Sequence, residues 1–314
     1  MKNKILKKDL DFNPCLPEDS VFFDINNSKL EIDFKKHKAK PIFSIIIPTY
    51  NRKKSLNFVL KNLFNQDYPK SKYEIIVIDD GSSDKTLESV KKIRSVCNLK
   101  YFYWPRKELP VKKEFRNLGK FYNRVGPARN IGLDNSKGEI ILFNDSDILV
   151  EKDCLKRHEQ YHKKYRNIIV RGFRIFLPGL KPEKPKYEKK LHCRMYDLSK
   201  EGWHRIATPN LSIRKKYLEK VGGFSRDFVF WGFEDTDLGY RLSRSLKLKF
   251  IWDENIKVYH LKHSKESGGK LNQFLSFKAG ASIMYNKYLD KEIISVFTDA
   301  ARRRFKKQYE NFSH

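Results

Sequence analysis

Short apolar runs alternate with segments of helical spacing between residues 41 and 145, and this alternation constrains the fold most. Each run is rich in β-formers and ends abruptly at proline or at polar residues, which is typical of a buried strand. Between the first two runs, Leu56, Val59, Leu60 and Leu63 recur at helical spacing. We therefore predict buried strands at 43–48, 74–78, 99–104 and 139–143.

Strands that alternate with helices form a parallel sheet with helices on both faces. We therefore expect an α/β fold with a mostly parallel central sheet. In such sheets ligands bind beyond the carboxyl ends of the strands. Polar clusters follow three of the expected strands and should meet at this edge: Thr49-Tyr50-Asn51, Asp79-Asp80 and Asp145-Ser146-Asp147.

Two of these clusters suggest a nucleotide and a metal ion. Acids at a strand end, such as Asp79 and Asp80, can accept hydrogen bonds from a base N–H or from ribose hydroxyls. Ordinary turn chemistry is the alternative, because Asp, Gly and Ser all favour turns. Asp145 and Asp147 can present oxygens to one Mg²⁺ or Mn²⁺, although such pairs also occur on solvated loops. No glycine-rich dinucleotide or P-loop fingerprint follows the first strand, which argues against those classes.

A second acidic cluster, Glu234, Asp235 and Asp237, follows an aromatic and glycine-rich loop. Carboxylates crowded in this way repel one another, so the cluster indicates cation binding or proton chemistry. Stabilisation of a helix N-terminus is the alternative, and it accounts for Asp237 better than for all three.

The charge balance favours polyanionic partners, because 66 Lys and Arg against 38 Asp and Glu give a net charge of +28. Nucleic-acid binding is therefore the alternative function. We find no signature of such a protein, and the acidic clusters would repel phosphates, so we expect no nucleic-acid partner. The four cysteines are scattered, and the sequence shows no apolar leader and no long apolar run. We therefore predict a cytoplasmic protein, with peripheral attachment to the inner face of the membrane as a further expectation.

Several motifs in order make the chain resemble glycosyltransferase family 2, which has the GT-A fold. The segment from Gly222-Gly223-Phe224 to Asp237-Leu238 also resembles the C-terminal half of the β-1,4-galactosyltransferases and chondroitin-type polymerase modules. The first set of motifs is Pro48-Thr49-Tyr50-Asn51-Arg52, Ile78-Asp79-Asp80-Gly81-Ser82, Ala128-Arg129-Asn130 with Gly132, Lys137-Gly138-Glu139 and Asp145-Ser146-Asp147.

The resemblance implies an inverting hexosyltransferase that uses a UDP-sugar, with galactose or an N-acetylhexosamine favoured. It implies a Mn²⁺ or Mg²⁺ ion held by Asp147, Asp145 and a histidine. His263 fits that histidine better than His260, which we keep in reserve. The implied nucleotide-binding residues are Pro48, Thr49, Asn51, Asp79, Asp80, Arg129 and Asp145.

The same resemblance makes Asp235 the general base and Glu234 a group that binds acceptor hydroxyls. Trp231, Gly232 and Trp203 are expected at the acceptor or sugar site, with core packing as the alternative for both tryptophans. The expected acceptor is a glycan or glycolipid of bacterial surface polysaccharide synthesis, and an anionic membrane surface is a further expected partner. A nucleotidyltransferase of similar topology is a weaker alternative.

We divide the chain into a polar lead-in at 1–40, a GT-A domain at 41–271 and a helical, basic C-terminal extension at 272–314. A basic segment at 105–125 departs from the family and is expected to be a solvated loop or a lid. In the extension, Phe297, Ala301, Phe305 and Phe312 fall near one helical face, which predicts packing on the domain or contact with an anionic membrane.

Overall fold

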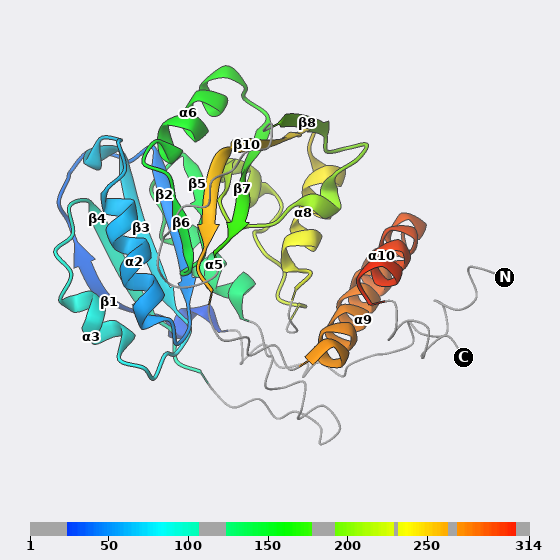
Figure 1. Ribbon diagram of the computed structural model, residues 1–314, viewed down its shortest axis with the longest axis horizontal. Helices are drawn as coiled ribbons and strands as arrows, with labels where there is room; N and C mark the ends of the chain where they lie inside the picture. Colours follow the sequence, from blue (N-terminus) through cyan, green and yellow to red (C-terminus); the bar gives the residue numbers. More distant parts are fainter. Residues whose placement is uncertain (1–23, 107–123, 178–191, 229–231, 263–268, 306–314) are drawn as a thin grey trace.

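The computed structural model describes residues 24–106, 124–177, 192–228, 232–262 and 269–305 (Figure 1). Within these residues ten strands form one sheet, in the order β1-β4-β3-β2-β5-β9-β7-β10-β6, with β8 also paired to β10. The first half is parallel: β2 (Phe43–Thr49) pairs with β3 (Tyr73–Asp79) and β5 (Ile140–Phe143), and β3 pairs with β4 (Asn98–Tyr103). The parallel sheet predicted from the strand and helix alternation is thus confirmed.

The second half of the sheet is mixed. Strand β9 (Leu211–Arg214) runs antiparallel to both β5 and β7 (Ile168–Phe176), and β7 runs parallel to β10 (Lys249–His260). The short strands β6 (Ile148–Val150) and β8 (Cys193–Asp197) both pair antiparallel with β10. Strand β10 therefore joins the segment after the Asp145 cluster to the rest of the sheet.

Helices cover both faces of the sheet. One apolar cluster receives side chains from α2 (Lys53–Phe64), α3 (Thr86–Lys91) and α6 (Cys154–Lys164). The other face is covered by α5 (Val125–Asp134), α7 (Lys215–Lys220), α8 (Glu234–Ser245) and the C-terminal helices. Three short 3-10 helices complete the described chain: η2 (Ile25–Asn27), η3 (Lys70–Lys72) and η5 (Trp203–Arg205).

Both ends of the described chain pack on the domain. Strand β1 (Lys29–Phe34) precedes residue 41 yet pairs antiparallel with β4. Helix α9 (Gly269–Tyr288) begins before residue 272, and α10 (Lys291–Arg304) follows it. The expected boundaries at 41 and 271 therefore do not coincide with breaks in the structure.

The apolar face of α10 is buried against the domain. Phe297, Ala301 and Phe305 are each at most 6% exposed, and the Phe297 ring lies 4.8 Å from that of Phe233, just before α8. Packing, rather than membrane contact, therefore accounts for this face; Phe312 lies outside the described residues. Among the described helices, none combines the length and apolar character needed to cross a membrane.

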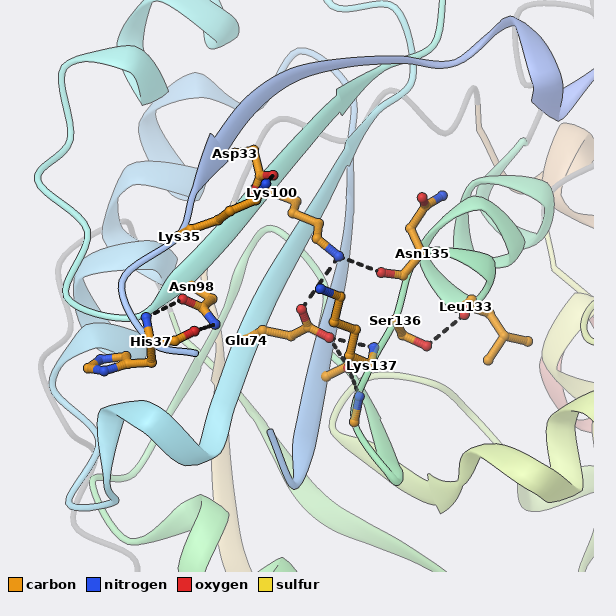
Figure 2. A network of polar contacts seen from close by, with 12 residues as sticks. Asp33, Lys35, His37, Glu74, Asn98, Lys100, Leu133, Asn135, Ser136 and Lys137 are labelled. Atoms are coloured by element: carbon orange, nitrogen blue, oxygen red, sulfur yellow. Dashed lines mark hydrogen bonds and ion pairs between the residues drawn. The ribbon is translucent and has the colours of Figure 1, made fainter. Parts of the chain in front are cut away.

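A buried polar network ties the strands together at the end of the sheet opposite the polar clusters (Figure 2). Glu74, 2% exposed, accepts hydrogen bonds from the Ser44 hydroxyl and the Lys137 amide, both at 2.6 Å. The Lys100 ammonium lies 3.6 Å from the second Glu74 oxygen and donates to the Asn135 carbonyl at 2.8 Å. One carboxylate thus links β2, β3 and β4 to the turn before β5.

Replacing Glu74 by alanine should lower the free energy of unfolding by about 2–4 kcal/mol, because it leaves buried donors without an acceptor. The control is Lys35→Ala, which removes an exposed pair with Asp33 (Figure 2) and should cost less than about 1 kcal/mol. Urea denaturation of the three proteins measures both values. Equal losses in the two variants would contradict the structural role of Glu74.

Candidate active site

The guanidinium of Arg129, on α5, brings the two acidic clusters of the sequence together. Its Nη2 donates to Asp145 at 3.1 Å, and its Nη1 lies 3.3 Å from Asp235 and 3.4 Å from Glu234. The side chain is only 3% exposed. The loop after β5 and the start of α8, which are far apart in the sequence, therefore face the same cation.

The turn before α8 places Glu234 and Asp235 at this position. Gly232 and Phe233 both have left-handed backbones, with φ of 90° and 76°, and α8 begins directly after them. The Phe233 ring packs on α9 and α10 and anchors the turn. An atom added as a Cβ at Gly232 would meet nothing within 4 Å, so backbone conformation and not crowding favours glycine there.

The third acid of the cluster has a structural role. Asp237 is fully buried, pairs with Arg241 one turn later at 2.6 Å and accepts a hydrogen bond from the Tyr288 hydroxyl at 2.6 Å. Asp237 thus ties α8 to α9 and stabilises the first turn of α8. This agrees with the expectation that Asp237 orients the helix.

Burial sets the charge state of Glu234. Burial, followed by the charge of the neighbouring Asp235, raises the pKa of Glu234 to about 7 against the opposing effect of Arg129. Its Oε2 atom is buried and has no hydrogen-bond partner among the described residues. Glu234 therefore has a carboxyl oxygen with unused hydrogen-bonding capacity, and near neutral pH this oxygen can accept or donate.

Asp235 is held at both carboxylate oxygens. One faces Arg129, and the other accepts from the Thr208 amide at 3.0 Å and from the Thr208 hydroxyl at 3.1 Å. Thr208 lies between η5 and β9 and is fully buried. A lone threonine in a loop carries no sequence signal, so only the structure identifies Thr208 as a partner of Asp235.

The sheet register brings His260 to Asp147. Strands β6 and β10 pair His260 with Ile148, and the Leu261 amide donates to the Asp147 carbonyl at 2.9 Å. As a result, His260 Nε2 lies 3.7 Å from an Asp147 carboxylate oxygen. His263, the preferred ligand from the sequence, lies outside the described residues.

A carboxylate suits Mn²⁺ or Mg²⁺, which complete their shell with water and phosphate oxygens, and a neighbouring imidazole nitrogen suits Mn²⁺ better than Mg²⁺. The Asp147 and His260 pair therefore fits the expected ion. Across the residues that the structure describes, no group of three or more His, Cys, Asp or Glu side chains is arranged as a complete metal site.

At the expected nucleotide end, Asn51 and Asp79 organise the loops. The Asn51 side chain accepts from the Ser83 amide at 2.8 Å, and Asp79 accepts from the Ser82 amide at 2.8 Å and from the Tyr101 hydroxyl. Asp79 is 1% exposed. Turn chemistry, the alternative reading of this cluster, thus describes Asp79 in this structure.

Asp80 is engaged by two arginines at the two described ends of the basic 105–125 segment. One oxygen pairs with Arg124 at 2.5 Å, and the other pairs with Arg106. The Arg106 guanidinium lies 3.6 Å above the Tyr50 ring, and burial raises the pKa of Asp80 while both arginines oppose this rise. A nucleotide that uses Asp80 must therefore compete with Arg106. Residues 107–123 lie outside the described part.

The other candidates differ in access. Trp203 is 1% exposed, its indole N–H donates to Glu292 at 2.8 Å, and its ring packs against Tyr240. The packing alternative therefore describes Trp203, whose ring is not open to a sugar; Trp231 lies outside the described residues. Pro48 and Thr49 end β2 as expected, and the Thr49 hydroxyl is buried without a hydrogen-bond partner among the described residues.

Comparisons with known proteins agree with this geometry. The family model described as "Glycosyl transferase family 2" matches residues 44–222, and one described as "N-terminal domain of galactosyltransferase" matches residues 189–264. Among curated proteins, the poly(ribitol-phosphate) beta-N-acetylglucosaminyltransferase TarS of Staphylococcus aureus is 40% identical over 114 residues, or 36% of this chain and 18% of TarS. The chondroitin synthase of Escherichia coli is 27% identical over 83% of this chain and 40% of its own length.

Solved structures give the same fold. The structure of S. aureus TarS 1–349 in complex with UDP-GlcNAc covers 83% of this chain and 72% of its own, with a TM-score of 0.61 and 22% identity. A mannosyltransferase from Pyrobaculum calidifontis in complex with GDP-Man and Mn²⁺ covers 85% of this chain and 76% of its own, with a TM-score of 0.53 and 16% identity. The expected GT-A fold is confirmed.

This chain spans less than two thirds of the length of the curated relatives it matches. The first family model nevertheless covers more than half of the chain, and its matched region contains the Arg129 and Asp145 side of the site. The chain belongs to glycosyl transferase family 2.

Proposed function

We propose that the protein is a metal-dependent, inverting glycosyltransferase that moves a sugar from a UDP-sugar to a hydroxyl of a glycan or glycolipid. The observation that carries this proposal is the convergence of Asp145 and Asp235 on Arg129. The contact brings the loop after β5 next to Asp235. This proximity supports a site in which one loop holds the donor diphosphate and the neighbouring acid accepts a proton.

Asp235 is the general base of the proposed reaction. It takes the proton of the acceptor hydroxyl while that oxygen attacks the anomeric carbon from the face opposite the leaving UDP, which inverts the configuration. The two hydrogen bonds from Thr208 and the contact with Arg129 fix the carboxylate in one orientation. Such preorganisation keeps the base aimed at the acceptor before the donor arrives.

Glu234, Asp147 and His260 have supporting roles. The free oxygen of Glu234 binds an acceptor hydroxyl, and Arg129 offsets the repulsion among the carboxylates. Asp147, with Asp145 and a histidine, would hold the divalent ion, which stabilises the charge on the leaving diphosphate when bound; within the described chain, His260 is the histidine beside Asp147. Thr49, Asn51 and Asp80 line the end proposed for the uridine.

The relatives' names support the choice of substrates. TarS is named for transfer of N-acetylglucosamine to poly(ribitol phosphate), and its structure holds UDP-GlcNAc. We therefore keep an N-acetylhexosamine, with galactose, as the favoured donor sugar. Bacterial surface polysaccharide is the proposed acceptor class, and its synthesis would place the protein at the inner face of the membrane.

Replacing Asp235 by asparagine should lower transfer by about 10²–10⁴-fold, because an amide cannot take the hydroxyl proton. UDP binding should persist, since Asp235 faces the acceptor. Transfer from radiolabelled UDP-GlcNAc and UDP-galactose measures the first effect, and calorimetry with UDP measures the second. Asp67→Asn, which alters an exposed acid paired with Lys156, is the control. Wild-type turnover in the Asp235 variant would remove this residue from the base role.

Chelation should suppress donor binding. EDTA should weaken the affinity for UDP-sugar, and added Mn²⁺ or Mg²⁺ should restore it, because the diphosphate needs a cation to approach Asp147. Calorimetry with UDP before and after dialysis against EDTA measures the change. An affinity that is the same in chelator and in Mn²⁺ would refute metal dependence.

The raised pKa of Glu234 predicts a pH-dependent loss of stability. Below pH 4.5 the carboxyl is protonated in both the folded and the unfolded chain. As the pH rises from 4.5 to about 7, the unfolded chain loses this proton while the folded protein keeps it, so unfolding becomes easier. Above about pH 7 the full penalty, about 3 kcal/mol, is present.

Glu234→Gln removes this titration. The variant should therefore gain up to about 3 kcal/mol of stability relative to wild type between pH 4.5 and 7.5. Urea denaturation over this range gives the difference, and Glu219→Gln, at a side chain that is 57% exposed, is the control. Parallel stability curves for wild type and Glu234→Gln would show that Glu234 titrates normally.

A further inference from the structure

Strand β7 carries two arginines without an acidic partner. Among the residues that the structure describes, neither Arg171 nor Arg174 has a carboxylate within ion-pair distance. The Nε atoms of both side chains are buried and make no hydrogen bond to a described group. Both side chains are half-buried, and a partly desolvated cation gains from an anionic partner. Two such residues on one strand are therefore placed to receive an anion from a ligand.

The side chains around this pair connect it to the active site. Arg171 donates to the Arg205 carbonyl at 3.0 Å, in η5, three residues before the Thr208 that holds Asp235. The Arg174 guanidinium lies 4.8 Å from the Phe176 ring, which is 5.1 Å from the ring of His260. The pair thus lies between the loop that positions the base and the end of β10.

Charge places the pair on the side of the base. Burial, followed by the neighbouring Arg174, lowers the pKa of Arg171 to about 10, and Asp235 is the acid that raises it. The two guanidiniums therefore repel each other, and Arg171 lies within the electrostatic reach of Asp235. Since Asp235 faces the acceptor, an anion that offsets this repulsion would belong to the acceptor.

We propose that Arg171 and Arg174 bind an anionic oxygen group, a phosphate or a carboxylate, that the acceptor carries near the hydroxyl under attack. The planar guanidinium fork suits both groups, because each presents two oxygens at matching spacing. The pair would select acceptors built from phosphodiester or uronic acid units and reject neutral glycans. This inference rests on the proposed function, because it uses Asp235 as the acceptor-facing base.

The test compares three probes on the full chain in the presence of UDP and Mn²⁺. The probes are a ribitol phosphate tetramer, a tetrasaccharide that contains glucuronic acid and a neutral tetrasaccharide of N-acetylglucosamine. Calorimetry gives the affinity of each probe for wild type, Arg171→Gln and Arg174→Gln. Arg94→Gln, which removes the same charge from an exposed site near the end of α3, is the matched control.

Wild type should bind at least one anionic probe about tenfold or more tightly than the neutral probe. Each of the two substitutions should lower the affinity for that anionic probe about tenfold, and Arg94→Gln should leave this affinity unchanged. The anionic probe that responds identifies phosphate or carboxylate as the recognised group. Thermal unfolding verifies that each variant is folded. Arg174→Gln carries the test if Arg171→Gln does not fold, because the Arg174 side chain, unlike that of Arg171, donates no hydrogen bond to a described backbone carbonyl.

Two results would overturn the inference. One is equal affinity of wild type for the neutral and the anionic probes. The other is a loss of UDP affinity in both variants that matches their loss of probe affinity, which would assign the pair to the donor diphosphate. A separate measurement of UDP binding by the wild-type protein, without any probe, tests the proposed function. If UDP does not bind, the use of a UDP-sugar donor is refuted, while the comparison of anionic and neutral probes can still be read.

Discussion

The contact of Arg129 with three carboxylates is the interaction on which the site depends. Asp145, Glu234 and Asp235 would repel one another strongly without a shared cation, and each lies within 3.4 Å of this guanidinium. Arg129 is buried on α5, which packs against β2 and β3, so the parallel half of the sheet fixes its position. The same side chain therefore couples the core of the fold to the chemistry of the site.

The mixed half of the sheet adds the remaining groups. Strand β10 carries His260 to Asp147, β9 follows the Thr208 that holds Asp235, and β7 carries two arginines that pair with no acid in the described part of the chain. None of these residues is adjacent in sequence to the group it serves. The pairing of β6, β7 and β9 with their neighbours is what brings them together.

At the end of the site proposed for the nucleotide, the arginines that hold Asp80 would compete with a bound nucleotide for its carboxylate. Asp80 is the strand-end acid that resembles the base-binding residue of the family, yet Arg106 and Arg124 already engage both its oxygens. The Arg106 guanidinium also covers the Tyr50 ring. In the proposed enzyme, the energy of uridine binding would include the cost of displacing Arg106 from these partners.

The sequence by itself determined the parallel strands and the loops that follow them, because continuous apolar runs and helical spacing are local properties. Glu234, Asp235 and Asp147 were identifiable for the same reason: acids clustered at strand and helix ends form short motifs. Only the tertiary structure decided that Arg129 contacts both acidic clusters and that His260 lies beside Asp147 within the described chain. It also decided that Trp203 packs in the core. The contact of Thr208 with Asp235, and the lack of an acidic partner for Arg171 within the described chain, are properties of strand pairing and burial, which no short stretch of sequence encodes.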